Sequence, residues 1–142
     1  MATVKNHDCK TELKKALLKV TPARLGVLSA LENSNTPIDA LDILSYLKHN
    51  QIKANRVTVF RIINALAEKG IATPIQFNDG KTRYEHESKI DHHHLVCESC
   101  GNTEDISDCS IPMLESEIMI KRKFLIKRHS LEFFGLCQNC QL

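Results

Sequence analysis

The sequence lacks any apolar run long enough to cross a membrane. A membrane-spanning helix needs about 18 or more consecutive apolar residues, and charged residues interrupt every stretch of that length. Residues 1–19 are polar and charged, without the apolar segment of a secretory signal peptide. Internal repeats and low-complexity segments are also missing. We therefore expect a cytoplasmic protein with no membrane contact.

An excess of one charge sign is also missing, because the formal net charge of +2 is too small to indicate a partner. The distribution is more informative: residues 1–80 carry a net charge of +4, whereas residues 81–142 carry −2 and hold five of the seven histidines. Chance alone can produce a +4 half. The length of 142 residues allows one or two small domains. We expect a mildly basic domain over residues 1–84 and an acidic, metal-binding domain over residues 85–142.

The spacing of the cysteines gives the clearest indication of metal binding. In a reducing cytosol, six cysteines favour metal binding over disulfides. Four of them form two Cys-x-x-Cys pairs, which can supply a closed tetrahedral zinc site with a structural role. We expect this zinc at Cys97, Cys100, Cys137 and Cys140. The remaining two, Cys9 and Cys109, have no partner at useful spacing and are expected to be plain thiols.

Three histidines stand directly before the first cysteine pair, in a segment that is expected to form a strand. Because strand side chains alternate between faces, His92 and His94 share one face, while Asp91 and His93 share the other. One strand can therefore serve two metal sites back to back. Imidazole suits Zn, Fe, Ni, Cu and Co far better than Mg or Ca.

Apolar spacing predicts four helices and a hairpin in the first domain. The helices are expected at 8–20, 22–32, 39–49 and 55–69, and the hairpin at 71–84 around an Asp-Gly turn. The first helix would carry Leu13, Ala16, Leu17 and Val20 on its apolar stripe, and the third would carry Leu41, Leu44 and Leu47. Helices followed by a hairpin indicate a winged helix. A plain helical bundle without DNA binding is the alternative.

The fourth helix has the composition of a DNA-reading helix. Val59, Ile62, Ile63 and Leu66 are spaced to pack inward. The opposite face presents Val57, Phe60, Arg61 and Asn64. Arginine and asparagine can bond base edges or phosphates, and a valine can touch a thymine methyl group. Arg56 and Thr58 flank this face near the start of the helix, where phosphates are favoured.

The second domain is patterned β-β-α-β, with a strand expected over 102–106, a helix over 111–123 and one or two strands over 124–136. Its apolar face is too large for some 60 residues to cover alone, so we expect dimerisation. A zinc deaminase would need His-x-Glu and Pro-Cys-x-x-Cys with an open metal position. The chain has neither motif, so we expect no enzyme. A zinc-stabilised protein-interaction module that binds no DNA is the remaining alternative.

Taken together, these motifs resemble the ferric uptake regulator family of bacterial metal-dependent repressors over nearly the whole chain. The matching pieces are Lys19-Val20-Thr21-Pro22-x-Arg24, Thr58-Val59-Phe60-Arg61, His92-His93-His94-Leu95-Val96-Cys97-x-x-Cys100-Gly101, His129-Ser130-Leu131 and Cys137-x-x-Cys140. The resemblance implies an α+β chain with a winged-helix domain that includes Arg24, followed by a dimerisation domain. It also implies a homodimer, for which we expect an AT-rich inverted repeat as the DNA partner; pairing of dimers into tetramers stays open.

The family pattern implies a structural zinc and one or two regulatory sites for Zn²⁺ or Fe²⁺, with Mn²⁺ as a further option. The main regulatory site would take His92, His94 and Asp105, together with Glu85 or His86 from the link between the domains. The second site would take Asp91, His93 and His129.

Three positions depart from the family pattern. The loop 36–38 has no ligand where the family often supplies a histidine, and Pro112 stands where the second site expects an acidic ligand. The second site is therefore absent or recruits Glu115. Phe60 replaces the usual tyrosine of the recognition helix and lacks its hydroxyl. The first two departures leave the sensed metal open.

Overall fold

The computed structural model describes residues 8–89, 92–107 and 110–141, so Asp91 and Cys109 lie outside the described residues. The chain is α+β and forms two compact units, of which the first runs up to Ser88 and the second begins at Lys89. Within the described ranges, no helix is long and apolar enough to cross a membrane.

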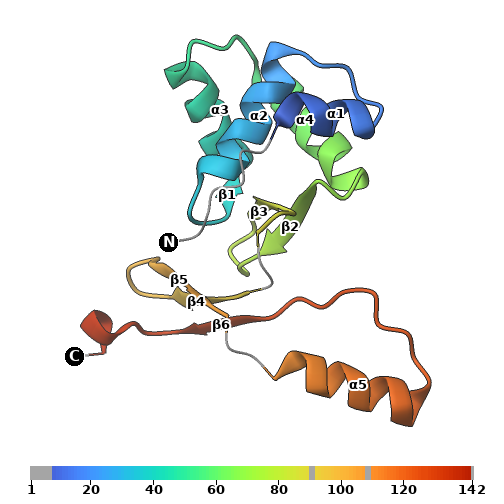
Figure 1. Ribbon diagram of the computed structural model, residues 1–142. Coiled ribbons are helices and arrows are strands. Elements are labelled where there is room, and N and C mark those ends of the chain that lie inside the picture. The colour runs from blue at the N-terminus through green and yellow to red at the C-terminus, as the bar shows by residue number, and fades with distance from the viewer. Residues whose placement is uncertain (1–7, 90–91, 108–109, 142) are drawn as a thin grey trace. The chain divides into compact units, whose positions relative to one another are not determined.

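The first unit is a winged helix (Figure 1). Its helices are α1 (Cys9–Lys15), α2 (Pro22–Asn33), α3 (Ala40–His49) and α4 (Arg56–Glu68). Its strands are β1 (Ile38–Asp39), β2 (Ala72–Gln76) and β3 (Thr82–His86), which form an antiparallel sheet in the order β1-β3-β2. The expected helices and hairpin are present, and β1 adds a short strand that the sequence pattern did not indicate.

Polar side chains fix where three of these helices begin. Thr21 accepts a hydrogen bond from the backbone N–H of Arg24, and Pro22 occupies the first turn of α2. Asp39 and Asp42 form a reciprocal capping box at the start of α3. Such caps satisfy N–H groups that have no partner within the helix. At α4 this role falls to Asn55, which accepts from the Thr58 N–H at 2.8 Å.

The core of the first unit lies between the helices and one face of the sheet. The inward residues expected for α4 are buried, namely Val59, Ile62, Ile63 and Leu66. They pack in one cluster with residues of α2 and α3 such as Leu28 and Leu47. The expected stripe of α3 is wrong at Leu41, which is 49% exposed, because Ile43 takes the inward position.

The first helix is shorter than expected and ends at Lys15. Leu17 adopts a left-handed conformation (φ 60°) and is 88% exposed. The backbone N–H of Leu18 donates to the Leu13 carbonyl at 2.9 Å, and that of Leu17 to Lys14 at 3.0 Å. This is a Schellman-type ending with leucine where glycine is usual, so the expected burial of Leu17 is wrong.

The wing is the β2–β3 hairpin, and its tip is closed by turn chemistry. Asn78 and Gly80 both have positive φ, as the Asn-Asp-Gly sequence predicts. The guanidinium of Arg83 forms two hydrogen bonds with the Asp79 carboxylate, at 2.8 and 3.1 Å, and lies 4.8 Å from the centre of the Phe77 ring.

The second unit follows the expected β-β-α-β order. It contains β4 (His93–Cys97), β5 (Thr103–Ile106), α5 (Ile111–Arg122), β6 (Glu132–Gly135) and the short 3₁₀ helix η1 (Gln138–Cys140). The sheet order is β5-β4-β6, with β4 and β6 parallel. Of the strand expected over 124–136, only Glu132–Gly135 is extended and paired. None of the residues of α5 is buried.

Candidate metal centres and nucleic-acid interface

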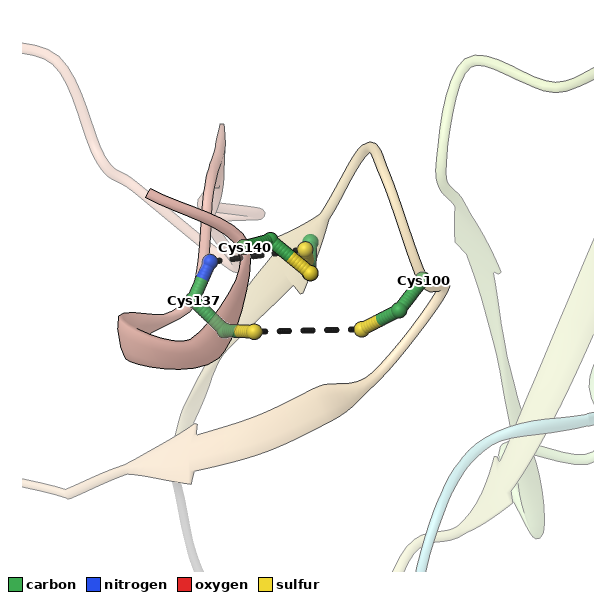
Figure 2. A group of neighbouring side chains, drawn as sticks. Cys100, Cys137 and Cys140 are labelled. Atoms are coloured by element: carbon green, nitrogen blue, oxygen red, sulfur yellow. Dashed lines mark hydrogen bonds between the residues drawn. The ribbon is translucent and has the colours of Figure 1, made fainter. Parts of the chain in front are cut away.

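The two Cys-x-x-Cys pairs come together in the second unit. One pair lies at the end of β4 and in the following turn, and the other lies at η1 (Figure 2). The four sulfurs are all within 4.8 Å of one another, and Cys100 Sγ is 3.8 Å from Cys137 Sγ. A zinc ion with Zn–S bonds of about 2.3 Å has S···S edges of about 3.8 Å in tetrahedral geometry. The spacing therefore fits zinc and is too long for a disulfide.

The pKa values of the thiols in this cluster favour a bound cation. The backbone N–H groups of Cys100 and Cys137 point at the Cys97 sulfur and lower the pKa of that thiol to about 6. A hydrogen bond with Ser99 lowers the pKa of Cys140, but the other three sulfurs outweigh it and raise that pKa to about 12. One thiolate is thus stabilised by the protein, and further thiolates beside it repel one another. A divalent metal ion removes this repulsion, so the donor set fits zinc.

A second group of possible ligands lies at the start of β4 and on β5. His92 and His94 point the same way, with their Nε2 atoms 3.0 Å apart. Asp105 is paired with His94 across the two strands, and its Oδ1 lies 3.9 Å from His92 Nε2 and 3.8 Å from His94 Nε2. Two imidazole nitrogens bound to one metal at about 2.1 Å are separated by about 3.0 to 3.4 Å. Three donors of the expected regulatory site therefore converge on one point.

The two expected ligands from the link lie at the end of β3. Glu85 is buried and sits opposite Thr73 of β2. His86 is directed into the first unit, where its Nε2 lies 2.9 Å and 3.0 Å from the two carboxylate oxygens of Glu12. Sequence reasoning missed Glu12 and its neighbour Glu32, because no motif connects α1 and α2 with β3. The part that Glu85 and His86 play in the regulatory site stays a prediction.

The opposite face of β4 holds the residues of the expected second site. The rings of His93 and His129 have centroids 5.2 Å apart, and His129 Nδ1 lies 2.7 Å from Glu115 Oε1. Glu115 is on α5, one turn after Pro112, so a carboxylate lies beside His129 although Pro112 offers none. The third expected ligand, Asp91, lies outside the described residues.

The outward face of α4 presents the side chains expected to meet DNA. Arg56, Val57, Phe60, Arg61 and Asn64 are all exposed, while Thr58 is half-buried at the first turn. The Arg56 guanidinium carbon lies 5.9 Å from the centre of the Phe60 ring. The Arg24 guanidinium instead donates to the Lys19 carbonyl at 2.9 Å. A cationic and partly apolar surface of this kind can contact phosphates and base edges.

Comparison with known proteins bears on both units. The model of the ferric uptake regulator family matches residues 15–134. The ferric uptake regulation protein of Escherichia coli K12 is 37% identical over 131 residues, which cover 92% of this chain and 88% of that protein. The crystal structure of the Vibrio cholerae ferric uptake regulator superposes with a TM-score of 0.78 at 33% identity, covering 92% of this chain and all of that one.

A third relative has more than one metal-binding site. The Helicobacter pylori ferric uptake regulator, whose structure is described as revealing three functional metal-binding sites, aligns with a TM-score of 0.78 at 26% identity. The alignment covers 94% of this chain and 89% of that one. The chain belongs to the ferric uptake regulator family, whose members are metal-responsive, DNA-binding and dimeric transcription regulators rather than enzymes.

Proposed function

We propose that this protein is a metal-dependent repressor in which a divalent metal at His92, His94 and Asp105 controls DNA binding by α4. The observation that carries the proposal is the convergence of these three donors, with 3.0 Å between the two imidazole nitrogens. Their mixture of nitrogen and carboxylate oxygen suits Zn²⁺, Fe²⁺ or Mn²⁺. Because loop 36–38 offers no histidine, fewer donors are available than the family often has.

Glu85 is the proposed fourth ligand, and it links metal binding to DNA binding. It belongs to the first unit and lies seven residues before His92 in the chain. A metal that binds both units would restrict their relative orientation. In a dimer, this sets the spacing of two recognition helices for successive major grooves of an AT-rich inverted repeat. Metal then raises DNA affinity through its preference for that orientation.

The opposite face of β4 supplies a proposed second, weaker site. His93 and His129 would bind metal there together with Glu115, and Asp91 would add a carboxylate. The support is the approach of the two rings and the hydrogen bond of His129 to Glu115. Replacing both His93 and His129 with alanine should remove one metal equivalent without abolishing metal-dependent DNA binding.

A cytoplasmic location is proposed from the function as a DNA-binding repressor, since the DNA target lies there.

The regulatory site is tested by fluorescence anisotropy of an AT-rich inverted-repeat duplex at fixed salt. Protein stripped of weakly held metal receives Zn(II), Mn(II), Co(II) or, anaerobically, Fe(II). The metal that gives tight binding at the lowest free concentration is the one sensed. His92→Ala with His94→Ala should abolish the metal response while zinc remains at the cysteines. His49→Ala, at an exposed histidine of α3, is the control. A metal response that survives in the double variant would refute the proposed regulatory site.

The DNA surface is tested separately with Arg56→Ala and Arg61→Ala in the metal-loaded protein. Each lost phosphate contact should lower affinity and reduce the salt slope by about 1, and a lost base contact should cost about 1 to 3 kcal/mol. Lys121→Ala, at an exposed lysine of α5, should change neither quantity. Unchanged DNA binding in both arginine variants would contradict the role of α4.

Absence of DNA binding with every metal would favour the alternative of a protein-interaction module. A doubled complex mass on one duplex would identify a pair of dimers.

A further inference from the structure

A third cluster of metal-binding side chains lies inside the winged-helix unit, formed from three separate elements. Glu12 comes from α1, Glu32 from α2 and His86 from the end of β3. One donor atom of each lies within 4.8 Å of the others. The His86 Nε2 atom is 2.9 Å from Glu12 Oε1 and 3.6 Å from Glu32 Oε1. All donors belong to the first unit, so this cluster is separate from His92, His94 and Asp105.

The cluster is shielded from solvent to a degree that is unusual for charged groups. The His86 side chain is 1% exposed, and those of Glu12 and Glu32 are 10% and 21% exposed. Two carboxyl groups are thus held beside one imidazole with little contact with water. A positive charge between two carboxylates favours their close approach in such a shielded place. A divalent metal ion would supply that charge.

The surroundings of His86 allow its Nε2 to act as a ligand atom. The Ser88 backbone N–H donates to His86 Nδ1 at 3.0 Å, and Ser88 Oγ lies 2.7 Å from the same nitrogen, so Nδ1 accepts and the ring N–H at Nε2 donates to Glu12. A metal ion bound at Nε2 would replace this proton and place the ring proton on Nδ1, where Ser88 Oγ could accept it, because metal-binding histidines usually donate their other N–H to a neighbouring acceptor. Ser88 is thus placed to orient the ring toward the two carboxylates.

A further donor lies at the edge of the cluster. Cys9 stands one helical turn before Glu12 on α1, so the two side chains share a face. The Cys9 Sγ is 3.4 Å from Glu32 Oε2. Burial, followed by the negative charge of Glu32, raises the pKa of this thiol to about 11. A thiol held beside carboxylates is a ready donor once a cation is present.

We propose that Glu12, Glu32 and His86 bind a divalent transition-metal ion, with Cys9 as a fourth donor, at a site independent of the regulatory and four-cysteine sites. Nitrogen, oxygen and sulfur donors in this combination suit Zn²⁺ or Co²⁺, and exclude Mg²⁺ and Ca²⁺ as preferred ions. The metal would fasten α1 to α2 and β3. This attachment matters because Leu13 is the one buried residue of α1.

The test is a Co(II) titration of the full-length protein that carries His92→Ala and His94→Ala and keeps zinc in the four-cysteine site. Visible and near-ultraviolet absorption report cobalt coordination and sulfur-to-cobalt charge transfer. The expected result is an equivalent of bound Co(II) that disappears when Glu12→Gln and Glu32→Gln are added. Cys9→Ser should remove the charge-transfer band and weaken binding about tenfold, while the visible bands remain.

The matched control is Glu68→Gln, at an exposed glutamate of α4, which should leave the titration unchanged. Glutamine keeps the shape of glutamate and can still accept a hydrogen bond from His86, so the double glutamine variant should fold, as near-ultraviolet circular dichroism will check. If it does not, Glu32→Gln alone replaces it, since Glu32 is the more exposed carboxylate. Equal cobalt stoichiometry with and without the glutamine substitutions would overturn the proposal. An ion-paired cluster that takes up no metal would give that result.

Discussion

Single residues determine how firmly each metal is held, and the four cysteines show this most directly. The two short Cys-x-x-Cys spacings each fix the separation of two sulfurs, which is why the pairs can be recognised in the sequence. The sequence does not show which thiol is deprotonated first. In the structure, two backbone N–H groups favour the Cys97 thiolate, whereas Cys140 depends on a cation to lose its proton. The four thiols are therefore unequal, although each is predicted to supply one bond to zinc.

Cys137→Ser should empty the structural zinc site. Three remaining thiolates leave an open position where water or a chelator can enter, and the N–H of residue 137 loses its fixed place 3.4 Å from the Cys97 sulfur. Zinc content after dialysis against EDTA should fall from one equivalent to near zero, and the free energy of unfolding of the second unit should fall by several kcal/mol. Cys109→Ser, outside both pairs, should retain zinc. Full zinc retention in Cys137→Ser would contradict the four-thiolate assignment.

The sequence separation of the residues involved explains why the cluster around His86 was not found from the sequence. His92 and His94 are two residues apart, so strand alternation alone places them on one face. Glu12 and His86 are separated by 74 positions, and no local rule brings them together. The sequence does contain a partial indication, since Cys9 and Glu12 are one helical turn apart. That spacing identifies two donors on one helix face but says nothing of what lies opposite.

At the level of elements, apolar periodicity predicted which helices exist, and capping chemistry determined where they end. The helices expected from residues 22 and 39 begin at Pro22 and Ala40, where Thr21 and Asp39 cap them. The end of α1 was not predicted, because leucine rarely adopts the left-handed conformation that Leu17 takes. The two-residue strand β1 was also missed, since it exists only through its pairing with β3. Contacts between residues that are distant in the sequence therefore determine whether and where such short elements form.

Helix α2 approaches α3 closely at Gly26, which predicts a specific sensitivity. A Cβ atom there would meet Leu47 Cδ2 and lie 2.8 Å from Ile52 Cδ1, and Leu47 is fully buried in the core, so its side chain and that of Ile52 would have to shift. Overpacking of this kind costs about 1 to 3 kcal/mol, while alanine regains up to about 1 kcal/mol of helix propensity. Gly26→Ala should therefore lower the free energy of unfolding by about 1 kcal/mol in urea denaturation. Ser45→Ala, on the exposed side of α3, should not destabilise the protein, and equal stability of the two variants would argue against close packing at Gly26.

At the scale of the whole molecule, the two units differ in how much of their apolar surface they bury themselves. All but two of the buried apolar residues from Leu13 to Tyr84 join one cluster in the first unit, whereas the second unit leaves most of its large apolar side chains exposed. The exposed set in that unit includes Leu95, Leu114, Ile120, Leu125, Phe133 and Leu136. The size of the apolar face in the sequence predicted that the second unit would leave apolar side chains exposed. Dimerisation, which is typical of the family, can cover them. The pairing partner within the sheet, β6 beside β4, could not be predicted because the connection from α5 is long.

The exposed pair Leu95 and Phe133 provides the test of that surface. These residues lie side by side on β4 and β6, and they are 36% and 48% exposed. Leu95→Glu with Phe133→Glu would place two charges on the surface that we expect a second copy to cover, and should give a monomer in sedimentation velocity at micromolar concentration. DNA affinity should fall with it, because a single winged helix contacts only half of an inverted repeat. The control is Leu17→Glu, at the exposed leucine just after α1. It introduces a negative charge in the first unit and should leave the dimer intact. A double variant that retains its zinc and still sediments as a dimer would move the interface away from this part of the sheet, and α5 would then be the remaining apolar surface to test.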